Sequence, residues 1–295
     1  MGNNPSAADI LEKEPWRKMP LTTTKIPDMR RELMGKIKTF QKKGNVNFLN
    51  ILLLGQSSSG KSSFVNSCAT ALYDANRIVT PCGVLEPQSE SVTARLEAHP
   101  IKISSTAFLP VRIFDCRGLH DLNGVHSDDI KNMCDGRIKN EYTFDPTLPV
   151  RSDNEKFRER PQLQDRMHCV VYVAAADNPK ELLADGRANE QLKAIRAVLS
   201  AANIPQLVLL NKIDRLGMKD ITTIFRNKLV KETCEGAMEF MSLPLGNVLP
   251  MINYTEEQTP DSMKDFLALF NLWYMMSKAN DYVGLQSDVP EGFND

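Results

Sequence analysis

The stretch GQSSSGKS, residues 55–62, decides the fold of this chain, because it completes the pattern GxxxxGK[ST] directly behind the apolar run 51–54. A glycine-bounded loop between a buried strand and a helix, here predicted over 62–73, is the context that a phosphate-binding loop requires. Its backbone N–H groups surround a phosphate, and the helix presents its N-terminal end to the anion. The alternative, a serine-rich linker, is disfavoured by the strand and the helix on either side.

Individual residues of this loop have distinct expected roles. Lys61 is expected to reach the β- and γ-phosphates and to serve catalysis, and the Ser62 hydroxyl to ligate Mg²⁺. The other residues expected to contact the nucleotide are Gly55, Ser58, Ser59, Gly60 and Ser63. The cofactors predicted from this motif are a nucleoside di- or triphosphate and Mg²⁺.

A second motif, DCRG at residues 115–118, follows the run VRIF (111–114) at the end of another predicted strand. In P-loop proteins the strand beside the phosphate-loop strand ends in an acid that holds Mg²⁺, and a glycine amide then meets the γ-phosphate. Asp115 is therefore a predicted metal ligand and Gly118 a predicted γ-phosphate contact. The pattern DxxG alone is weak, so its value rests on its order in the chain and on the strand before it.

The residues that would support hydrolysis are less clearly marked. Thr93 is the candidate for the threonine that meets Mg²⁺ in the triphosphate state, with Ser89 and Ser91 as rivals. Leu119 stands directly after DxxG, where small GTPases often have a glutamine that orients the attacking water. His120 is a candidate substitute, and an ordinary polar loop residue is the interpretation that we favour. With no arginine assigned to the transition state, slow intrinsic turnover is expected.

The third motif, NKID at residues 211–214, follows the apolar run 207–210 and selects the base. Asp214 can accept hydrogen bonds from the N1–H and the exocyclic amine of guanine, whereas adenine would leave this carboxylate unpaired. Asn211 is expected to bond the base and tie the loop, and the stem of Lys212 to cover the ring.

Two further residues, Asn253 and Tyr254, are expected in a loop that closes over the base after the last predicted strand. All of these groups fall at carboxyl ends of strands, which is where open α/β sheets bind ligands. The predicted ligand is therefore GTP or GDP. Use of ATP, with NKID as a coincidence, is the alternative.

Short β-rich runs alternate with helical stretches from Phe48 onward, a pattern typical of a parallel sheet covered by helices on both faces. The predicted fold class is α/β: a P-loop GTPase-like three-layer sandwich with a mostly parallel six-stranded sheet, one antiparallel edge strand and an N-terminal helix. The predicted strands span 48–54, 94–104, 111–115, 169–174, 206–210 and 247–252.

The chain is expected to divide into three parts. Residues 1–24, rich in Pro, Asn, Ser and Thr, are interpreted as a mobile leader, and 25–46 as an amphipathic helix that packs on the domain behind it. The GTPase domain is expected over 47–295, with a packed terminal helix over 262–283. It contains an inserted polar segment, 140–166, interpreted as a lid, a binding loop or a disordered loop.

Composition excludes some classes of function. The formal net charge of −1 argues against a nucleic-acid binder, because affinity for the phosphate backbone needs a concentrated basic surface. The six cysteines form no CxxC pair and are interpreted as reduced cytosolic thiols. No run approaches the roughly 18 apolar residues of a membrane span, so a soluble, cytoplasmic protein is expected. The opening MGNNPS fits the pattern for myristoylation of Gly2, and membrane association is expected only with that modification; a disordered start is the alternative.

Together these motifs resemble the TRAFAC-type GTPases, and longer stretches narrow the resemblance. The interferon-induced protein 44-like family is the one that they look like, through PWRK (15–18), RRELM (30–34), LLLGQSSSGKSSFVNS (52–67), DCRGL (115–119), YTFDP (142–146) and DRMHCVVYV (165–173). The resemblance implies an interferon- or infection-induced cytoplasmic protein with an antiviral or antiproliferative association and a link to microtubules. Relatives carry a TLDc domain ahead of the GTPase domain, for which this chain is expected to have no room.

Two functions are compatible with these residues. In the first, the chain is a switch: GTP orders residues 76–93 and 116–135, slow hydrolysis releases them, and an unknown protein effector reads the difference. In the second, it is a pseudo-GTPase whose nucleotide is structural and whose 140–166 loop or terminal helices bind partners. The intact phosphate and metal residues favour the first function, and Leu119 favours the second. A nucleotide-dependent homodimer is a further expectation.

Overall fold

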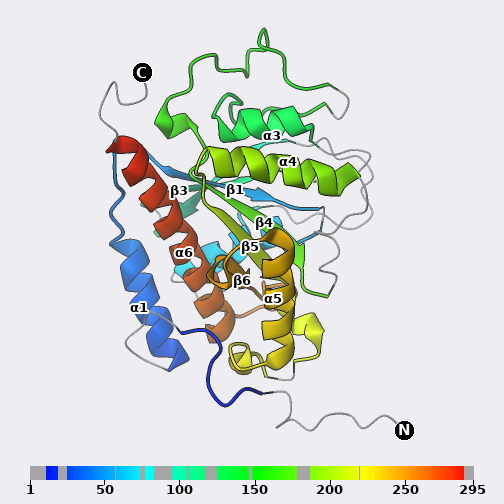
Figure 1. Cartoon of the computed structure of the whole chain (residues 1–295). Helices are drawn as coiled ribbons and strands as arrows, with labels where there is room; N and C mark the ends of the chain where they lie inside the picture. Colours follow the sequence, from blue (N-terminus) through cyan, green and yellow to red (C-terminus); the bar gives the residue numbers. More distant parts are fainter. Residues whose placement is uncertain are drawn as a thin grey trace.

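The structure is a computed structural model in which a central sheet lies between layers of helices (Figure 1). It describes residues 11–18, 25–56, 58–73, 77–82, 95–104, 106–116, 125–145, 148–177, 187–218 and 220–288. Within these residues, no helix is both long enough and apolar enough to span a membrane.

The sheet has six strands in the order β2-β3-β1-β4-β5-β6. All neighbouring pairs are parallel except β2 with β3, which is antiparallel. This confirms the predicted fold class, including the antiparallel edge strand. The strands are β1 (Leu49–Leu54), β2 (Glu97–Lys102), β3 (Phe108–Asp115), β4 (Cys169–Ala175), β5 (Gln206–Asn211) and β6 (Val248–Pro250).

The helices cover both faces of the sheet. They are α1 (Ile26–Lys38), α2 (Lys61–Leu72), α3 (Ser127–Cys134), α4 (Arg187–Ala201), α5 (Lys228–Met241) and α6 (Ser262–Ser287). Because parallel connections are right-handed, the change of direction after β3 places α2 and α6 on one face and α3, α4 and α5 on the other. The packing agrees, since α2 and α1 contact α6, and α3 contacts α4. Strands β1, β4, β5 and β6 are buried along their whole length.

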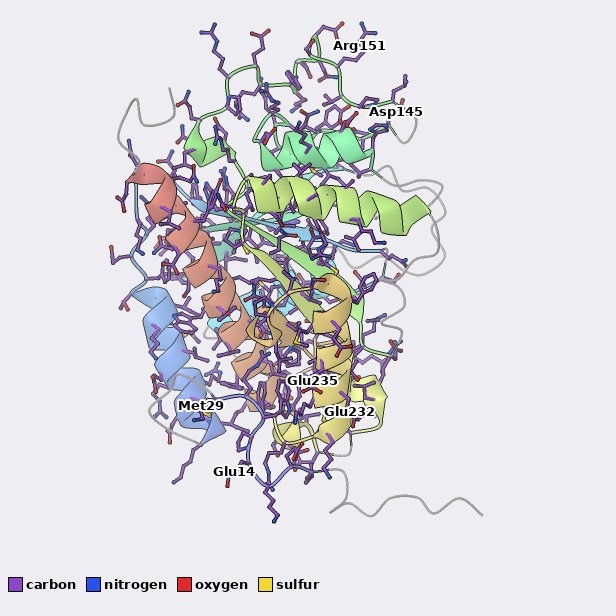
Figure 2. All side chains as sticks on the ribbon, viewed as in Figure 1. Glu14, Met29, Asp145, Arg151, Glu232 and Glu235 are labelled. Carbon is purple, nitrogen blue, oxygen red and sulfur yellow. The ribbon has the colours of Figure 1, made fainter. Side chains whose placement is uncertain are left out.

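The N-terminal helix α1 packs on α6 through Met29, Leu33 and Ile37, as its helical spacing predicts; Figure 2 labels Met29 on this helix. It is shorter than the predicted 25–46, because it ends at Lys38. The chain that follows the helix packs against α6 instead. The Asn280 side chain of α6 accepts a hydrogen bond from Lys43 N–H at 2.6 Å and donates one to Gln41 O at 3.2 Å.

Residues 11–18, part of the expected leader, lie against the α5 side of the molecule. The ring of Trp16 stands 5.6 Å from that of Phe225. The Arg17 guanidinium donates to Leu245 O at 2.7 Å and to Val248 O at 2.5 Å, and burial lowers its pKa. The division of the chain into leader, helix and GTPase domain stays a prediction.

The polar segment 140–166 is described apart from residues 146–147, and both of its ends are hydrogen-bonded to the sheet, the first to Ala98 and the last to Asn50. Near its start, Tyr142 O accepts from Leu96 N–H at 2.9 Å, and Asn140 Oδ1 accepts from Ala98 N–H at 2.8 Å. Farther along, Val150 N–H donates to the buried Asp129 of α3 at 2.8 Å. Figure 2 labels Asp145 and Arg151 on this segment, beyond α3.

The amino end of the sheet is closed by a network around Asn50, a fully buried residue of β1. Its Oδ1 accepts from Arg112 at 2.9 Å, and its Nδ2 donates to the carbonyls of Gln164 and Arg166 at 2.9 and 2.8 Å. Its main-chain N–H donates to His168 Nδ1 at 2.9 Å. The network ties three chain segments together, and no local sequence motif marks it.

Candidate nucleotide-binding site

The loop after β1 has the conformation of a phosphate-binding loop because two of its glycines are sterically required. A Cβ at Gly55 would lie 2.2 Å from Val173 O on β4, and a Cβ at Gly60 would lie 1.9 Å from Asn211 Nδ2. Gly60 also has φ +97° and immediately precedes α2. The loop is therefore bent tightly between the ends of β4 and β5, with the first turn of α2 directly behind it.

Lys61 opens α2 and folds back over the loop. Its ammonium group donates to Gly55 O at 2.9 Å and to Gln56 O at 2.8 Å, and the residue is buried. The positive charge is thus held at the loop rather than in solvent. A phosphate oxygen at the loop would meet a lysine that is already in place.

Ser62 and Asp115 meet where the ends of β1 and β3 adjoin. The Ser62 hydroxyl donates to Asp115 Oδ2 at 2.6 Å, while Asp115 Oδ1 is buried and has no hydrogen-bond partner among the described residues. A buried carboxylate oxygen without a partner is costly unless a ligand satisfies it. The hydroxyl and the carboxylate together suit Mg²⁺, which takes oxygen ligands and keeps several waters or phosphate oxygens.

The Ser62 hydroxyl and the Asp115 carboxylate would supply only part of the coordination shell of Mg²⁺. In the part of the chain that the structure describes, no group of three or more His, Cys, Asp or Glu side chains could hold a metal ion. The fit of Ser62 and Asp115 to Mg²⁺ therefore depends on phosphate and water oxygens for the remaining ligands.

The NKID segment joins the end of β5 to the phosphate loop. Asn211 Nδ2 donates to Ser59 O at 3.0 Å, and Asn211 Oδ1 accepts from Lys212 N–H at 2.8 Å. Lys212 has a left-handed backbone, with φ +58°, which turns the chain into a short 3-10 helix containing Asp214. The Asp214 carboxylate is exposed and forms no hydrogen bond with the described residues.

The side chains of Asn253 and Tyr254 point to different parts of the molecule. Asn253 Nδ2 donates to Gly60 O at 3.1 Å, so this residue reaches the phosphate loop. The ring of Tyr254 is buried, and its hydroxyl donates to Asp265 Oδ1 of α6 at 2.7 Å. The Tyr254 side chain is therefore committed to the α6 junction, and only its main chain could meet a base. That the loop containing Asn253 and Tyr254 closes over a base stays a prediction.

The remaining predicted residues divide into two groups. Ser58 is exposed with φ +60°, Ser59 Oγ is buried without a hydrogen-bond partner in the described structure, and Ser63 O accepts from the Ser67 hydroxyl at 2.9 Å. Thr93, Gly118 and His120 lie outside the described residues, as do Ser57, Ser89, Ser91 and Leu119.

Sequence reasoning missed two polar residues of α2. Asn66 forms hydrogen bonds with both main-chain groups of Cys82: its Oδ1 accepts from Cys82 N–H at 2.9 Å, and its Nδ2 donates to Cys82 O at 3.0 Å. The Ser67 hydroxyl lies 3.2 Å from Asn253 Oδ1 and also accepts from Tyr254 N–H. The signal was the pair Asn-Ser within the mostly apolar stretch 64–72 of this helix, because buried polar groups need partners.

Two cysteines beside the site stay protonated at neutral pH. Burial raises the pKa of Cys116 to about 12, although the charge of Lys61 opposes this shift. Burial, followed by the charges of Asp115 and Glu97, raises the pKa of Cys82 to about 12 as well. Neither thiol is therefore a candidate nucleophile or metal ligand.

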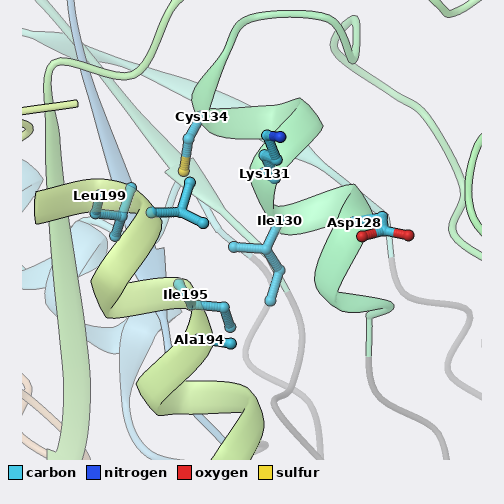
Figure 3. Close-up of a pocket in the computed structure, with 8 residues that line it drawn as sticks. Asp128, Ile130, Lys131, Cys134, Ala194, Ile195 and Leu199 are labelled. Atoms are coloured by element: carbon cyan, nitrogen blue, oxygen red, sulfur yellow. The ribbon is translucent and has the colours of Figure 1, made fainter. Parts of the chain in front are cut away.

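A separate small cavity lies between α3 and α4 (Figure 3). Its volume is about 120 Å³, and apolar side chains of Ile130, Ala194, Ile195 and Leu199 form much of its wall. Ligand pockets usually measure about 300–1,000 Å³, so this cavity is too small for a nucleotide. It contains none of the motif residues.

Comparisons with known proteins confirm the resemblance stated from the sequence. The chain is 28% identical to interferon-induced protein 44 of Mus musculus, over 91% of this chain and 63% of that protein. It is 27% identical to interferon-induced protein 44-like of Homo sapiens, over 90% of this chain and 59% of that protein. The chain thus spans 59–63% of the length of these curated relatives. No protein-family model matches it.

Among solved structures, the chain is similar to Toc33 from Arabidopsis thaliana in complex with GDP and Mg²⁺, with 14% identity, coverage of 89% of this chain and 93% of that chain, and a TM-score of 0.44. It is also similar to a probable GTP-binding protein engB, with 16% identity, coverage of 69% and 88%, and a TM-score of 0.36. The fold class of the present chain rests on its own strand order and loop geometry.

Proposed function

We propose that this protein binds guanine nucleotides with Mg²⁺ and hydrolyses GTP slowly. The observation that carries the proposal is the convergence of four strand ends on one loop. Hydrogen bonds join Ser62 to Asp115, Asn211 to Ser59, and Asn253 to Gly60, at 2.6, 3.0 and 3.1 Å. The groups that the sequence assigns to phosphate, metal and base thus belong to one bonded assembly.

The phosphates would occupy the N-terminal end of α2. The inward amides of the loop and the Lys61 ammonium group supply positive charge there, while Ser62 and Asp115 would hold Mg²⁺. When bound, Mg²⁺ would neutralise negative charge on the phosphates during phosphoryl transfer. The protein groups in place bind and orient the nucleotide; no glutamine follows DxxG to orient water, because that residue is Leu119.

Guanine selectivity would come from Asp214. Its carboxylate is exposed and forms no hydrogen bond within the described part of the chain, so it can accept from both N1–H and the exocyclic amine of guanine, and adenine would offer it neither. Asn211 would hold this segment at the correct distance from the phosphate loop, because it bonds Ser59 O.

Calorimetry with GDP, a GTP analogue and an ATP analogue, each with Mg²⁺, tests nucleotide choice. The wild type is expected to prefer both guanine nucleotides, and Asp214→Ala to lose about 100-fold or more of that preference. Glu232→Ala, an exposed acid on α5 labelled in Figure 2, is the matched control and should bind as the wild type does. Equal affinity for adenine nucleotides, or none for guanine nucleotides, would refute the proposal.

Single-turnover release of phosphate tests hydrolysis. We expect slow release that Lys61→Ala abolishes, and acceleration by a partner or by self-association, because an added arginine is worth about 10³–10⁵ in rate. Fast release by dilute monomeric protein would contradict this expectation.

A second candidate function is a non-hydrolysing scaffold, and Leu119 is the observation that favours it. Tight GTP binding without any phosphate release would support it. In the GTPase switch an effector protein would read the nucleotide-dependent surface, and a homodimer across the nucleotide face would supply the missing catalytic group. In the scaffold the nucleotide would be structural, and partners would bind the 140–166 loop or the terminal helices.

The biological setting is inferred from the relatives' names. Three proteins, two called interferon-induced protein 44 and one called interferon-induced protein 44-like, share 26–28% identity with most of this chain. We infer that this protein is also induced by interferon or infection, acts in the cytoplasm and has an antiviral or antiproliferative effect, with membrane attachment only if Gly2 is acylated. Transcript levels before and after interferon treatment test the induction; unchanged levels would exclude it.

A further inference from the structure

Helix α1 inserts one charged side chain among the helices that carry the nucleotide loops. Arg30 Nε donates to Asp265 Oδ2 of α6 at 2.8 Å, and Arg30 Nη2 lies 3.5 Å from Ala71 O in the last turn of α2. The Asp265 side chain is 3% exposed, so this ion pair is largely withdrawn from solvent. One guanidinium group therefore links α1 to both of the helices on this face.

The other oxygen of Asp265 leads toward the phosphate loop. Asp265 Oδ1 accepts from the Tyr254 hydroxyl at 2.7 Å, and the same hydroxyl accepts from Asp261 N–H at 2.7 Å. The main-chain N–H of Tyr254 donates to Ser67 Oγ on α2 at 3.2 Å. Tyr254 is thus fixed at its ring end by α6 and at its backbone by α2.

Asn253, the next residue toward β6, completes the connection. Its Nδ2 donates to Gly60 O at 3.1 Å, and its own carbonyl accepts from Lys264 Nζ of α6 at 3.2 Å. A continuous series of contacts therefore runs from Arg30 through Asp265, Tyr254 and Asn253 to the phosphate loop.

We propose that Arg30 and Asp265 are positioning residues for nucleotide binding, so that α1 forms part of the nucleotide site through this series of contacts. The proposal rests on the proposed function. If α1 holds Asp265, and Asp265 holds the Tyr254–Asn253 segment against Gly60, then nucleotide affinity depends on the docking of α1. By linkage, nucleotide must stabilise the docked α1 by the same free energy.

The direction of the effect follows from burial. Burial raises the pKa of Asp265, while the hydrogen bond from Tyr254 and the charge of Arg30 oppose that rise. Without Arg30 the buried carboxylate loses its counter-charge, and it must then take up a proton or move toward solvent. Either change weakens its hold on the Tyr254 hydroxyl.

The dissociation rate of a fluorescent GDP from the full chain with Mg²⁺ tests the proposal. Arg30→Met keeps an aliphatic stem and removes the charge, and we expect dissociation about five- to fiftyfold faster than in the wild type. The matched control is Arg31→Met, the neighbouring arginine on α1, whose side chain is 79% exposed and pairs with Asp28. It should leave the rate unchanged.

The second variant is Tyr254→Phe, which keeps the ring and removes only the hydroxyl. It should also accelerate GDP dissociation, and it carries the test if Arg30→Met does not fold. A third measurement is amide hydrogen exchange in α1, which GDP should slow in the wild type and slow less in Tyr254→Phe. A purely structural ion pair would lower thermal stability without changing either nucleotide readout.

The outcomes separate the two proposals. Wild-type protein that does not bind GDP overturns the proposed function and this inference with it. GDP binding by the wild type, with Arg30→Met and Tyr254→Phe both dissociating at the wild-type rate, overturns only the inference. Exchange in α1 that does not respond to GDP overturns it as well.

Discussion

The two ends of the sheet use buried polar side chains in opposite ways. At the amino end, Asn50 has partners for its side-chain oxygen, its side-chain nitrogen and its main-chain N–H. At the carboxyl end, Ser59 Oγ and Asp115 Oδ1 are buried without partners among the described residues. Satisfied polar groups fix a structure, whereas unsatisfied ones leave bonding capacity for a ligand. The difference separates residues that maintain the fold from residues that are expected to bind nucleotide.

Backbone strain does not follow this division, because Asn203 and Ser242, which precede β5 and β6, also have positive φ angles of 54° and 45°. At the carboxyl end, Ser58 and Lys212 have positive φ angles of 60° and 58°, and Gly60 has 97°. Strained residues of this kind persist where the surrounding structure holds them, often at binding sites. If the comparison is correct, substitutions at the two ends should change different measured quantities.

The largest expected effect is that of Gly60→Ala. A Cβ there would lie 1.9 Å from Asn211 Nδ2, and the backbone has φ +97°, so the loop must shift. We expect GDP affinity to fall more than about 1,000-fold, equivalent to about 4 kcal/mol, as measured by calorimetry.

The control for that change is Gly236→Ala on α5, where an added Cβ meets no atom within 4 Å. It should retain nucleotide affinity and raise the unfolding free energy by about 1 kcal/mol, because alanine favours helix. Wild-type affinity in Gly60→Ala would break the comparison at the carboxyl end.

The second-largest expected effect is a loss of folding stability at low pH, caused by His168 at the amino end of the sheet. His168 accepts from Asn50 N–H through Nδ1 and donates through Nε2 to Leu163 O at 2.9 Å, so it is neutral in the folded protein. Burial lowers its pKa from 6.5 to about 4. Between these values the unfolded state binds the additional proton, so stability is complete above about pH 6.5 and falls as the pH drops toward 4. The expected loss is about 3 kcal/mol.

Denaturant unfolding at pH 7 and pH 4 measures this loss. His168→Gln offers an acceptor and a donor without a titrating group, so the dependence on pH over this range should be weaker than in the wild type. GDP affinity at pH 7 should be the same in both proteins. A changed affinity would show that the two ends are not separable in the way proposed.

The smallest effect should come from Ser58→Gly. The exposed serine has φ +60°, a conformation that glycine adopts without a steric penalty. We expect the unfolding free energy to rise by about 0.5–1 kcal/mol. Ser58→Ala keeps the Cβ and should give no such gain; an equal gain in both variants would show that the backbone strain is not the cause.

Much of the nucleotide site was predictable because its motifs are local. GQSSSGKS, Asp115 and NKID each stand directly after a predicted strand, and the topology of a parallel sheet brings such ends together. The hydrogen bonds from Asn211 to Ser59 and from Ser62 to Asp115 are the geometric result.

What the sequence did not predict depends on partners distant in the chain. The bond from Arg30 to Asp265 spans 235 residues, and that from Asn50 to His168 spans 118. No local pattern marks either pair. The early end of α1 at Lys38 has a similar cause, because Asn280 bonds the residues that follow the helix.

The pairing of residues 140–143 with residues 95–98 has a consequence for assembly. On the outer side of β2, the N–H groups of Leu96 and Ala98 are already bonded to this segment, and Pro100 has no N–H to offer. An incoming strand would therefore find few donors on that border of the sheet, which protects it from edge-to-edge aggregation. Copies of this protein are therefore not expected to associate by joining their sheets along β2.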